Sequence, residues 1–247
     1  MKALFILCGI CIVIFSCKPI DNEFSAQEII DKSISASGVE KIANAELSFK
    51  FRDKYYIASR KNGIFNLNRV FIENNDSIND VISNSGFERI KNSKPIKVQD
   101  SMALKYSESI NSVHYFSVLP FGLNDKAVKK NLLGESEIKG KNYYKIKITF
   151  LKEGGGVDYN DVFIYWIEKE NFLIGYFAYT FKINGGGKRF REVRNEHLID
   201  GIRFVDYTNY KPKDNNIKLY DLDQVFQKDE LMKVSEINLS DIQITFN

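Results

Sequence analysis

Hydrophobic and polar residues alternate along much of this chain. Residues 47–51 read Leu-Ser-Phe-Lys-Phe, and residues 144–150 repeat the pattern with Lys, Lys and Thr between apolar residues. A period of two is typical of a strand with one buried face. Residues 162–167 are apolar at both parities, which predicts a strand covered on both faces. Strands are predicted at 47–57, 64–72, 144–150, 162–167, 173–183, 190–198, 202–210 and 242–246.

The clearest helical signal lies near the amino terminus. Ser25 and Glu28 form a capping box, an apolar stripe at helical spacing follows, and Gly38 supplies the stop. Further helices are predicted at 101–119, which Pro120 ends, at 125–133, and as one turn at 80–83 within the polar stretch 74–86.

This order of elements predicts an α+β fold in one domain, residues 24–247. No linker divides the chain and no internal repeat is present. Antiparallel sheets of this size curl or close. We therefore expect a strongly curved antiparallel sheet, an unclosed β-barrel or half-barrel, with helices covering its concave face.

The amino-terminal residues have a separate pattern. Lys2 is followed by an apolar run to Phe15 that is too short for a membrane span and is typical of a signal peptide. The run ends in Ile-Phe-Ser-Cys, which resembles a bacterial lipobox. That resemblance implies a signal peptide at 1–16, lipidation of Cys17 and a lipidated tether at 17–23. The alternative is a plain signal peptide with an incidental cysteine.

This interpretation limits the chemistry of the mature chain. The sequence has three cysteines: Cys8 and Cys11 leave with the signal peptide, and Cys17 carries the lipid. The folded part therefore has no thiol for a disulfide, a nucleophile or a metal. The formal net charge is +3, and loss of Lys2 lowers it by one. This near balance argues against a nucleic-acid partner. Lys18, next to Cys17, favours an outer-membrane location facing the periplasm, and no second membrane segment follows.

Catalytic and metal signatures are weak. His114 and His197 are far apart and belong to no ligand cluster, and no G-x-S-x-G motif occurs. Asp158 and Asp161 lie near glycines as solvated turn residues, with a weak calcium site as the alternative. The glycine runs 154–156 and 185–187 lack a phosphate-loop context and predict flexible hairpin loops. We expect no enzyme, no metal and no cofactor.

The densest basic stretch is also ambiguous. It contains Lys188, Arg189, Arg191 and Arg194, interrupted by Glu192 and Glu196. A solvated strand of mixed charge is one interpretation. Contact with anionic lipid headgroups is the other.

Aromatic residues make up 13% of the chain and concentrate in the predicted strands. They could simply fill a large β core. Alternatively, one parity lines a cavity on the concave side of the sheet. The candidates for lining such a cavity are Trp166, Phe177, Tyr179, Phe181 and Phe204.

Several short segments carry a family resemblance. They are residues 29–38 and 47–52, His-Tyr-Phe at 114–116 with Leu119-Pro120, Tyr-Trp-Ile at 165–167, and Asp-Gly-Ile-Arg-Phe at 200–204. They resemble a family of uncharacterised Gram-negative lipoproteins and, more widely, the lipoprotein carriers of the LolA/LolB type. The resemblance implies an incomplete barrel with a cavity for acyl chains.

These observations favour a membrane-anchored lipoprotein of the cell envelope that binds or carries a hydrophobic, acyl-chain ligand. Its expected partners are the membrane, through the lipid anchor, and the lipid itself. One alternative is a structural or interaction lipoprotein with a filled core. The second alternative is an enzyme acting on envelope material.

Overall fold

The computed structural model describes residues 24–155, 159–182 and 185–247. The predicted signal peptide, the tether with Cys17, and Asp158 lie outside these described residues. Within the described ranges, no helix is long and apolar enough to cross a membrane.

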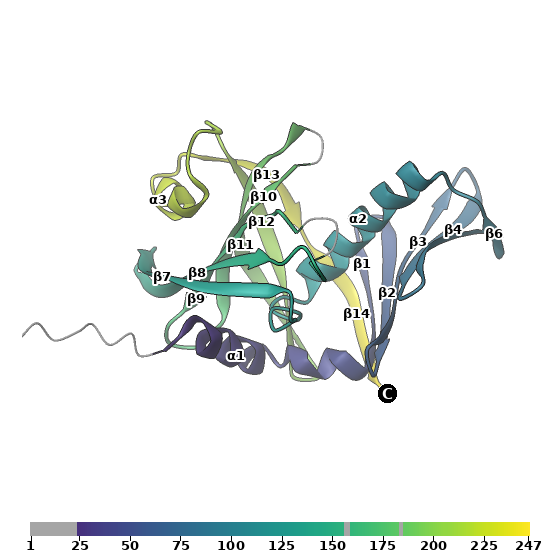
Figure 1. Ribbon diagram of the computed structural model, residues 1–247, viewed down its shortest axis with the longest axis horizontal. Coiled ribbons are helices and arrows are strands. Elements are labelled where there is room, and N and C mark those ends of the chain that lie inside the picture. Colours follow the sequence, from purple (N-terminus) through teal and green to yellow (C-terminus); the bar gives the residue numbers. More distant parts are fainter. Residues whose placement is uncertain (1–23, 156–158, 183–184) are drawn as a thin grey trace, which may run out of the picture.

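Helix α1 (Ala26–Ser37) begins at the predicted capping box. The backbone N–H of Glu28 donates to Ser25 Oγ at 3.2 Å, and that of Ser25 donates to Glu28 Oε2 at 2.7 Å. Ile29 and Ile30 are fully buried. Gly38, at φ 66°, ends the helix and leads into the 3-10 helix η1 (Val39–Asn44). Figure 1 shows α1 beside one sheet and η1 reaching the other.

The first sheet has seven antiparallel strands in the order β14-β1-β2-β3-β4-β5-β6. The carboxyl-terminal strand pairs with β1, so distant parts of the sequence meet here (Figure 1). The strands are β1 (Ala45–Phe51), β2 (Lys54–Lys61), β3 (Ile64–Glu73), β4 (Asp76–Ser83), β5 (Gly86–Lys91), β6 (Lys94–Ile96) and β14 (Leu239–Phe246).

The helical turn predicted at 80–83 is wrong, because these residues belong to β4. Asn74 and Asn75 both have positive φ and form the tight hairpin turn before the strand. Ile78 and Asp80 are buried on one face, which we call the inner face, while residues of the other parity lie nearer solvent. A strand with one wet face carries many polar residues, and this explains the misleading polarity of the segment.

The second sheet also has seven antiparallel strands, in the order β13-β12-β11-β10-β9-β8-β7. Residues 163–167 are all buried, which confirms the strand expected to be covered on both faces. The strands are β7 (Val128–Ile138), β8 (Lys141–Phe150), β9 (Phe163–Glu168), β10 (Ile174–Phe181), β11 (Gly187–Ile199), β12 (Ile202–Pro212) and β13 (Leu231–Ile237).

The helix predicted at 125–133 is also wrong, because most of the segment lies in the edge strand β7. Its residues alternate between half-buried and exposed along the ladder with β8. Gly134 lies at a shift of register in this ladder and does not end a helix. An edge strand has one pairing neighbour and exposes many side chains, so its hydrophobic signal is weak.

Helix α2 (Asp100–Ser117) is the second long helix expected from the sequence. It contacts β3, β4 and β5, and Ile110 and His114 are buried against the first sheet. Near its carboxyl end, Phe116 stacks on Phe177 of β10 with ring centroids 5.4 Å apart. One helix therefore packs against both sheets (Figure 1).

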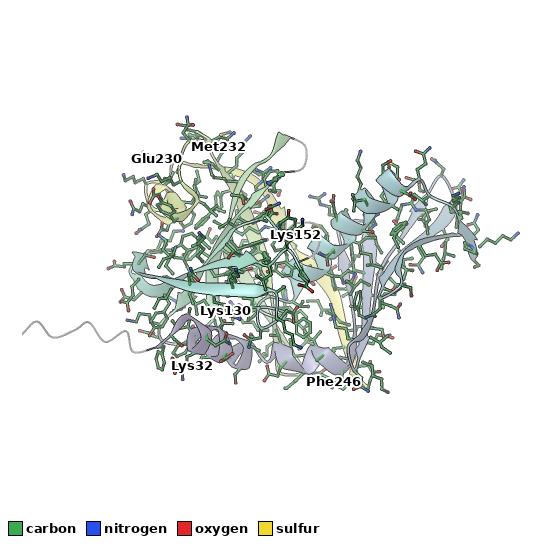
Figure 2. All side chains as sticks on the ribbon, viewed as in Figure 1. Lys32, Lys130, Lys152, Glu230, Met232 and Phe246 are labelled. Atoms are coloured by element: carbon green, nitrogen blue, oxygen red, sulfur yellow. The ribbon has the colours of Figure 1, made fainter. Side chains whose placement is uncertain are left out.

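A short helical segment that the sequence pattern did not predict covers the other face of the second sheet. It consists of η3 (Leu219–Asp221) and α3 (Leu222–Gln227), and Phe226 stacks on Phe190 at 4.8 Å. Figure 2 labels Glu230 and Met232 next to α3, far from Phe246 at the end of β14. The α+β class and its antiparallel, unclosed architecture are confirmed, with the strands divided between two sheets.

Candidate functional site

A cavity of about 630 Å³ lies between α2 and one end of the first sheet. Its volume falls within the range of about 300–1,000 Å³ that is usual for small-molecule sites. Its lining is mainly apolar and comes from the first sheet and its β2–β3 turn, from α2 and η1, and from the loops after α2 and after β8. Residues that line it include Arg60, Phe65, Leu67, Ile82, Asn111 and Phe121.

The strand register explains how the floor of this cavity forms. Arg60 faces Phe65 across β2 and β3, and Leu67 faces Ile82 across β3 and β4. All four have the parity of the inner face, so their side chains converge under α2. The loop after β8 reaches the cavity at Gly155, and Figure 2 shows Lys152 on this loop, between the two sheets in this view.

Arg60 is the cation of this lining. Its guanidinium lies 5.3 Å from the centroid of Phe121, and its Nη1 has no hydrogen-bond partner among the described residues. Burial lowers the pKa of Arg60 to about 10, so the group stays charged at neutral pH. Burial also raises the pKa of Asp125, another lining residue. The cavity thus combines an apolar surface with a charged donor.

An ionic cluster next to the cavity holds α2 on the sheet. Asp80 is fully buried and accepts hydrogen bonds from Arg69 at 2.6 Å and from Arg89 at 2.5 Å and 2.9 Å. Arg69 also donates to Ser109 Oγ on α2 at 3.0 Å, and Arg89 lies 4.0 Å from the ring centroid of Tyr106. The charges of the sheet therefore fix the helix that closes the cavity.

The five aromatic candidates from the sequence do not gather at one place. Phe177 and Tyr179 pack against Phe116 with centroids 5.4 Å and 5.1 Å away, in the core between the second sheet and the helices. Phe181 lies at the end of the same strand, with the Arg189 guanidinium 4.6 Å from its centroid.

Trp166 and Phe204 belong to two other cores. Trp166 is fully buried on the α3 side, and its Nε1 donates to Asp223 Oδ2 at 3.1 Å. Phe204 packs in the cluster around η1 and β1. None of the five candidates, all of them described residues, lines the 630 Å³ cavity.

Sequence reasoning missed the residues that do line this cavity. One signal was present, because Arg60 has the parity of Tyr56 and Ala58, both of which are buried. A charged residue on the apolar parity of a strand marks an unusual position. Phe121 and the α2 residues join it only through tertiary contacts, which no local pattern encodes.

The histidines lie in different environments. Buried His114 donates from Nε2 to the carbonyl oxygen of Asn68 at 3.0 Å, and burial lowers its pKa to about 3. His197 Nε2 lies 3.3 Å from Asp206 Oδ1.

Asp161 is half-buried just before β9. The described residues contain no group of three or more His, Cys, Asp or Glu side chains that could hold a metal.

The basic stretch differs from a solvated strand at one position. Arg191 is buried, and its guanidinium lies 4.0 Å from the ring centroid of Phe116. Arg189 and Arg191 share one face, as their pairing with Tyr179 and Phe177 requires. The solvated interpretation is therefore wrong for Arg191, because α2 covers this part of β11.

Comparisons with known proteins give a family. The model of a family of unknown function, DUF6503, matches residues 2–239. A comparison with curated proteins gives no match.

Among solved structures, the chain is similar to a LolA superfamily protein of Nitrosomonas europaea, with 14% identity, 89% of this chain and 93% of that chain covered, and a TM-score of 0.49. It is also similar to a DUF1329 family protein of Desulfovibrio piger, with 13% identity, 89% and 92% coverage, and a TM-score of 0.41. A third match is the lipoprotein LppX of Mycobacterium tuberculosis, with 12% identity, 66% and 92% coverage, and a TM-score of 0.30.

Proposed function

The chain belongs to the DUF6503 family, whose function is unknown, and we propose that it binds an acyl-chain lipid without catalysis. The site of binding is the 630 Å³ cavity between α2 and the inner face of the first sheet. The observation that carries this proposal is the mainly apolar lining of that cavity. Each methylene group transferred from water into such a lining gains about 0.8 kcal/mol.

Arg60 indicates the charge of the lipid headgroup and its position in the cavity. A charged guanidinium with a donor atom that has no partner among the described residues favours an acidic headgroup, such as the carboxylate of a fatty acid. The chain would lie along Leu67 and Ile82, with the headgroup near Arg60. The ligand in this proposal is therefore a single-chain, anionic lipid.

The predicted lipid anchor completes the proposal. Acylation of Cys17 would hold the domain, residues 24–247, at a membrane of the cell envelope, where lipids of this class are available. The tether at 17–23 would leave the cavity free to face the periplasm.

The proposal can be tested with the full chain carrying Cys17→Ser, which removes the lipidation site. Titration with a fluorescent fatty acid should show saturable binding with a stoichiometry near one. Ile82→Trp adds a large side chain at the floor of the cavity and should weaken binding at least tenfold. The matched control is Val81→Trp, because Val81 is the next residue of β4 and points to the opposite face.

A second comparison tests the headgroup. Arg60→Leu should weaken binding of a fatty acid about tenfold and leave binding of the matching fatty alcohol nearly unchanged. If the wild-type chain binds neither lipid and carries none after purification, the acyl-chain proposal is wrong. That outcome would favour the structural or interaction lipoprotein.

A further inference from the structure

A second, smaller cavity lies on another side of α2. Its volume is about 210 Å³, and it is lined by the end of β1, strands β11 to β14 and the last two turns of α2. The α2 residues that line it are Ser112, Val113, Phe116 and Ser117, whereas Ser107, Glu108 and Asn111 line the first cavity. At about 100° per residue, these two sets lie on different sides of the helix.

Arg191 forms part of the wall of this second cavity. Arg191 is only 8% exposed. Its Nη2 donates to Tyr179 Oη at 2.9 Å, but its Nε has no hydrogen-bond partner among the described residues. The rings of Phe116 and Phe177 lie 4.0 Å and 5.4 Å from the guanidinium carbon. Aromatic faces attract a cation but do not accept its in-plane N–H groups.

Two other arginines of the described chain are as little exposed as Arg191, and both have carboxylate partners. Arg69 pairs with Asp80 at 2.6 Å, and Arg203 pairs with Glu196 at 2.6 Å. Arg191 has no such ion pair within the described ranges. A buried charge is costly unless an opposite charge and hydrogen bonds compensate it. Of the three arginines that are less than one-tenth exposed, Arg69, Arg191 and Arg203, Arg191 is therefore the one whose counter-charge the described residues do not supply.

A complementary polar atom lies next to Arg191. Asn209 is its direct partner across the β11–β12 ladder, and both residues line the cavity. Asn209 is 8% exposed, and its Nδ2 donates to Ser235 Oγ at 3.3 Å. Its Oδ1 has no donor among the described residues. One wall of the cavity thus presents a charged donor and a neutral acceptor side by side.

We propose that this cavity binds a small organic carboxylate that carries a hydroxyl or amino group next to the acid. The carboxylate would accept hydrogen bonds from the Arg191 guanidinium, which matches its planar geometry. The adjacent hydroxyl or amino group would donate to Asn209 Oδ1. A cavity of about 210 Å³ is smaller than the usual ligand pocket of about 300–1,000 Å³, so it has room only for a small acid. This site is separate from the proposed acyl-chain site, so either can fail without the other.

Calorimetric titration of the full chain carrying Cys17→Ser tests the proposal, with lactate as the probe. Acetate lacks the neighbouring hydroxyl group and lactamide lacks the charge. Lactate should bind saturably, acetate about tenfold more weakly, and lactamide without measurable heat. Arg191→Lys keeps the charge but loses the planar fork, and it should weaken lactate binding at least tenfold.

Two further variants make the result specific. Asn209→Leu should remove the preference for lactate over acetate, because it removes the acceptor for the hydroxyl group. Arg189→Met is the control, since Arg189 lies on the same face of β11 but does not line this cavity. The proposal is overturned if lactate does not bind, if it binds equally well to Arg191→Lys, or if acetate or inorganic phosphate binds as tightly as lactate. Urea unfolding of each variant shows whether that variant is folded. If Arg191→Lys does not fold, the loss of the preference for lactate over acetate in Asn209→Leu tests the proposal instead.

Discussion

Asp80 lies fully buried beneath α2 and accepts a hydrogen bond of 2.6 Å from the guanidinium of Arg69. Arg89 completes this cluster from the neighbouring strand. The two arginines also contact Ser109 and Tyr106 on the helix, so one carboxylate organises the contact between α2 and the first sheet.

Replacement of this carboxylate should be strongly destabilising. Asp80→Asn keeps the size of the side chain but leaves two arginines without a counter-charge, and we expect a loss of about 3–5 kcal/mol in the free energy of unfolding. The control is Asp76→Asn on the same strand, because the ion pair of Asp76 with Lys91 lies near the surface and should contribute little to stability. Urea unfolding measures both, and equal losses for the two variants would contradict the role assigned to Asp80.

His114 should make the stability of the protein depend on pH. Burial lowers its pKa from 6.5 to about 3 in the folded chain, so the folded state holds the neutral ring. As the pH falls below about 6.5, the unfolded state takes up a proton that the folded state does not bind. The free energy of unfolding should therefore fall by about 1.4 kcal/mol per pH unit from this group as the pH decreases toward the folded pKa.

His114→Gln keeps a donor for the carbonyl oxygen of Asn68 and removes the titration. Urea unfolding between pH 7 and pH 4.5 should show a shallower decline in this variant than in the wild type. His197→Gln is the control, because His197 is about one-third exposed. An unchanged slope in His114→Gln would rule out this origin of the acid sensitivity.

Gly38 should tolerate no side chain. It ends α1 at φ 66°, and a Cβ atom there would lie 2.1 Å from the carbonyl oxygen of Gly201. Gly63 has a similar φ of 80° but has open space around it. We expect Gly63→Ala to cost about 1 kcal/mol, from the left-handed conformation alone. Gly38→Ala should cost about 3 kcal/mol or more, because the backbone must also move. Thermal unfolding of the two variants checks the difference, and similar melting temperatures would refute the clash.

Cys17 should determine where the protein resides. The wild-type chain should incorporate a radiolabelled fatty acid and fractionate with membranes, because two or more acyl chains hold a protein firmly. Cys17→Ser should lose the label and move to the soluble fraction. A Cys11→Ser variant should behave as the wild type, since Cys11 lies within the predicted signal peptide. Membrane association of Cys17→Ser together with an unlabelled wild type would contradict the anchor.

Local sequence patterns determined many of the elements. The capping box of Ser25 and Glu28 and the stop at Gly38 bound α1 correctly, because caps depend on residues within one turn of each other. Alternation at 144–150 predicted β8, because successive side chains of a strand point to opposite faces of the sheet, and this too is a local property. The α+β class followed from the order of these elements.

Pairing and packing decided what the local patterns did not contain. Residues 128–133 form a strand because β8 pairs with them. Strand β14 joins the first sheet by pairing with β1, which lies more than a hundred residues away in the sequence, so no local pattern contains this contact. Alternation told which residues share a face, yet it did not tell what covers that face. Phe177 therefore packs under Phe116, whereas Trp166 lies under α3.

The same distinction holds for the two cavities. Arg60 and Arg191 are recognisable in the sequence only as charged residues in strands. The extent to which each is covered depends on α2, a helix whose position is fixed by Asp80, Arg69 and Arg89 rather than by its own residues alone. A sequence determines the parity and the charge of a side chain, but the cost of burying that charge, and hence its use as a binding group, arises only when distant elements enclose it.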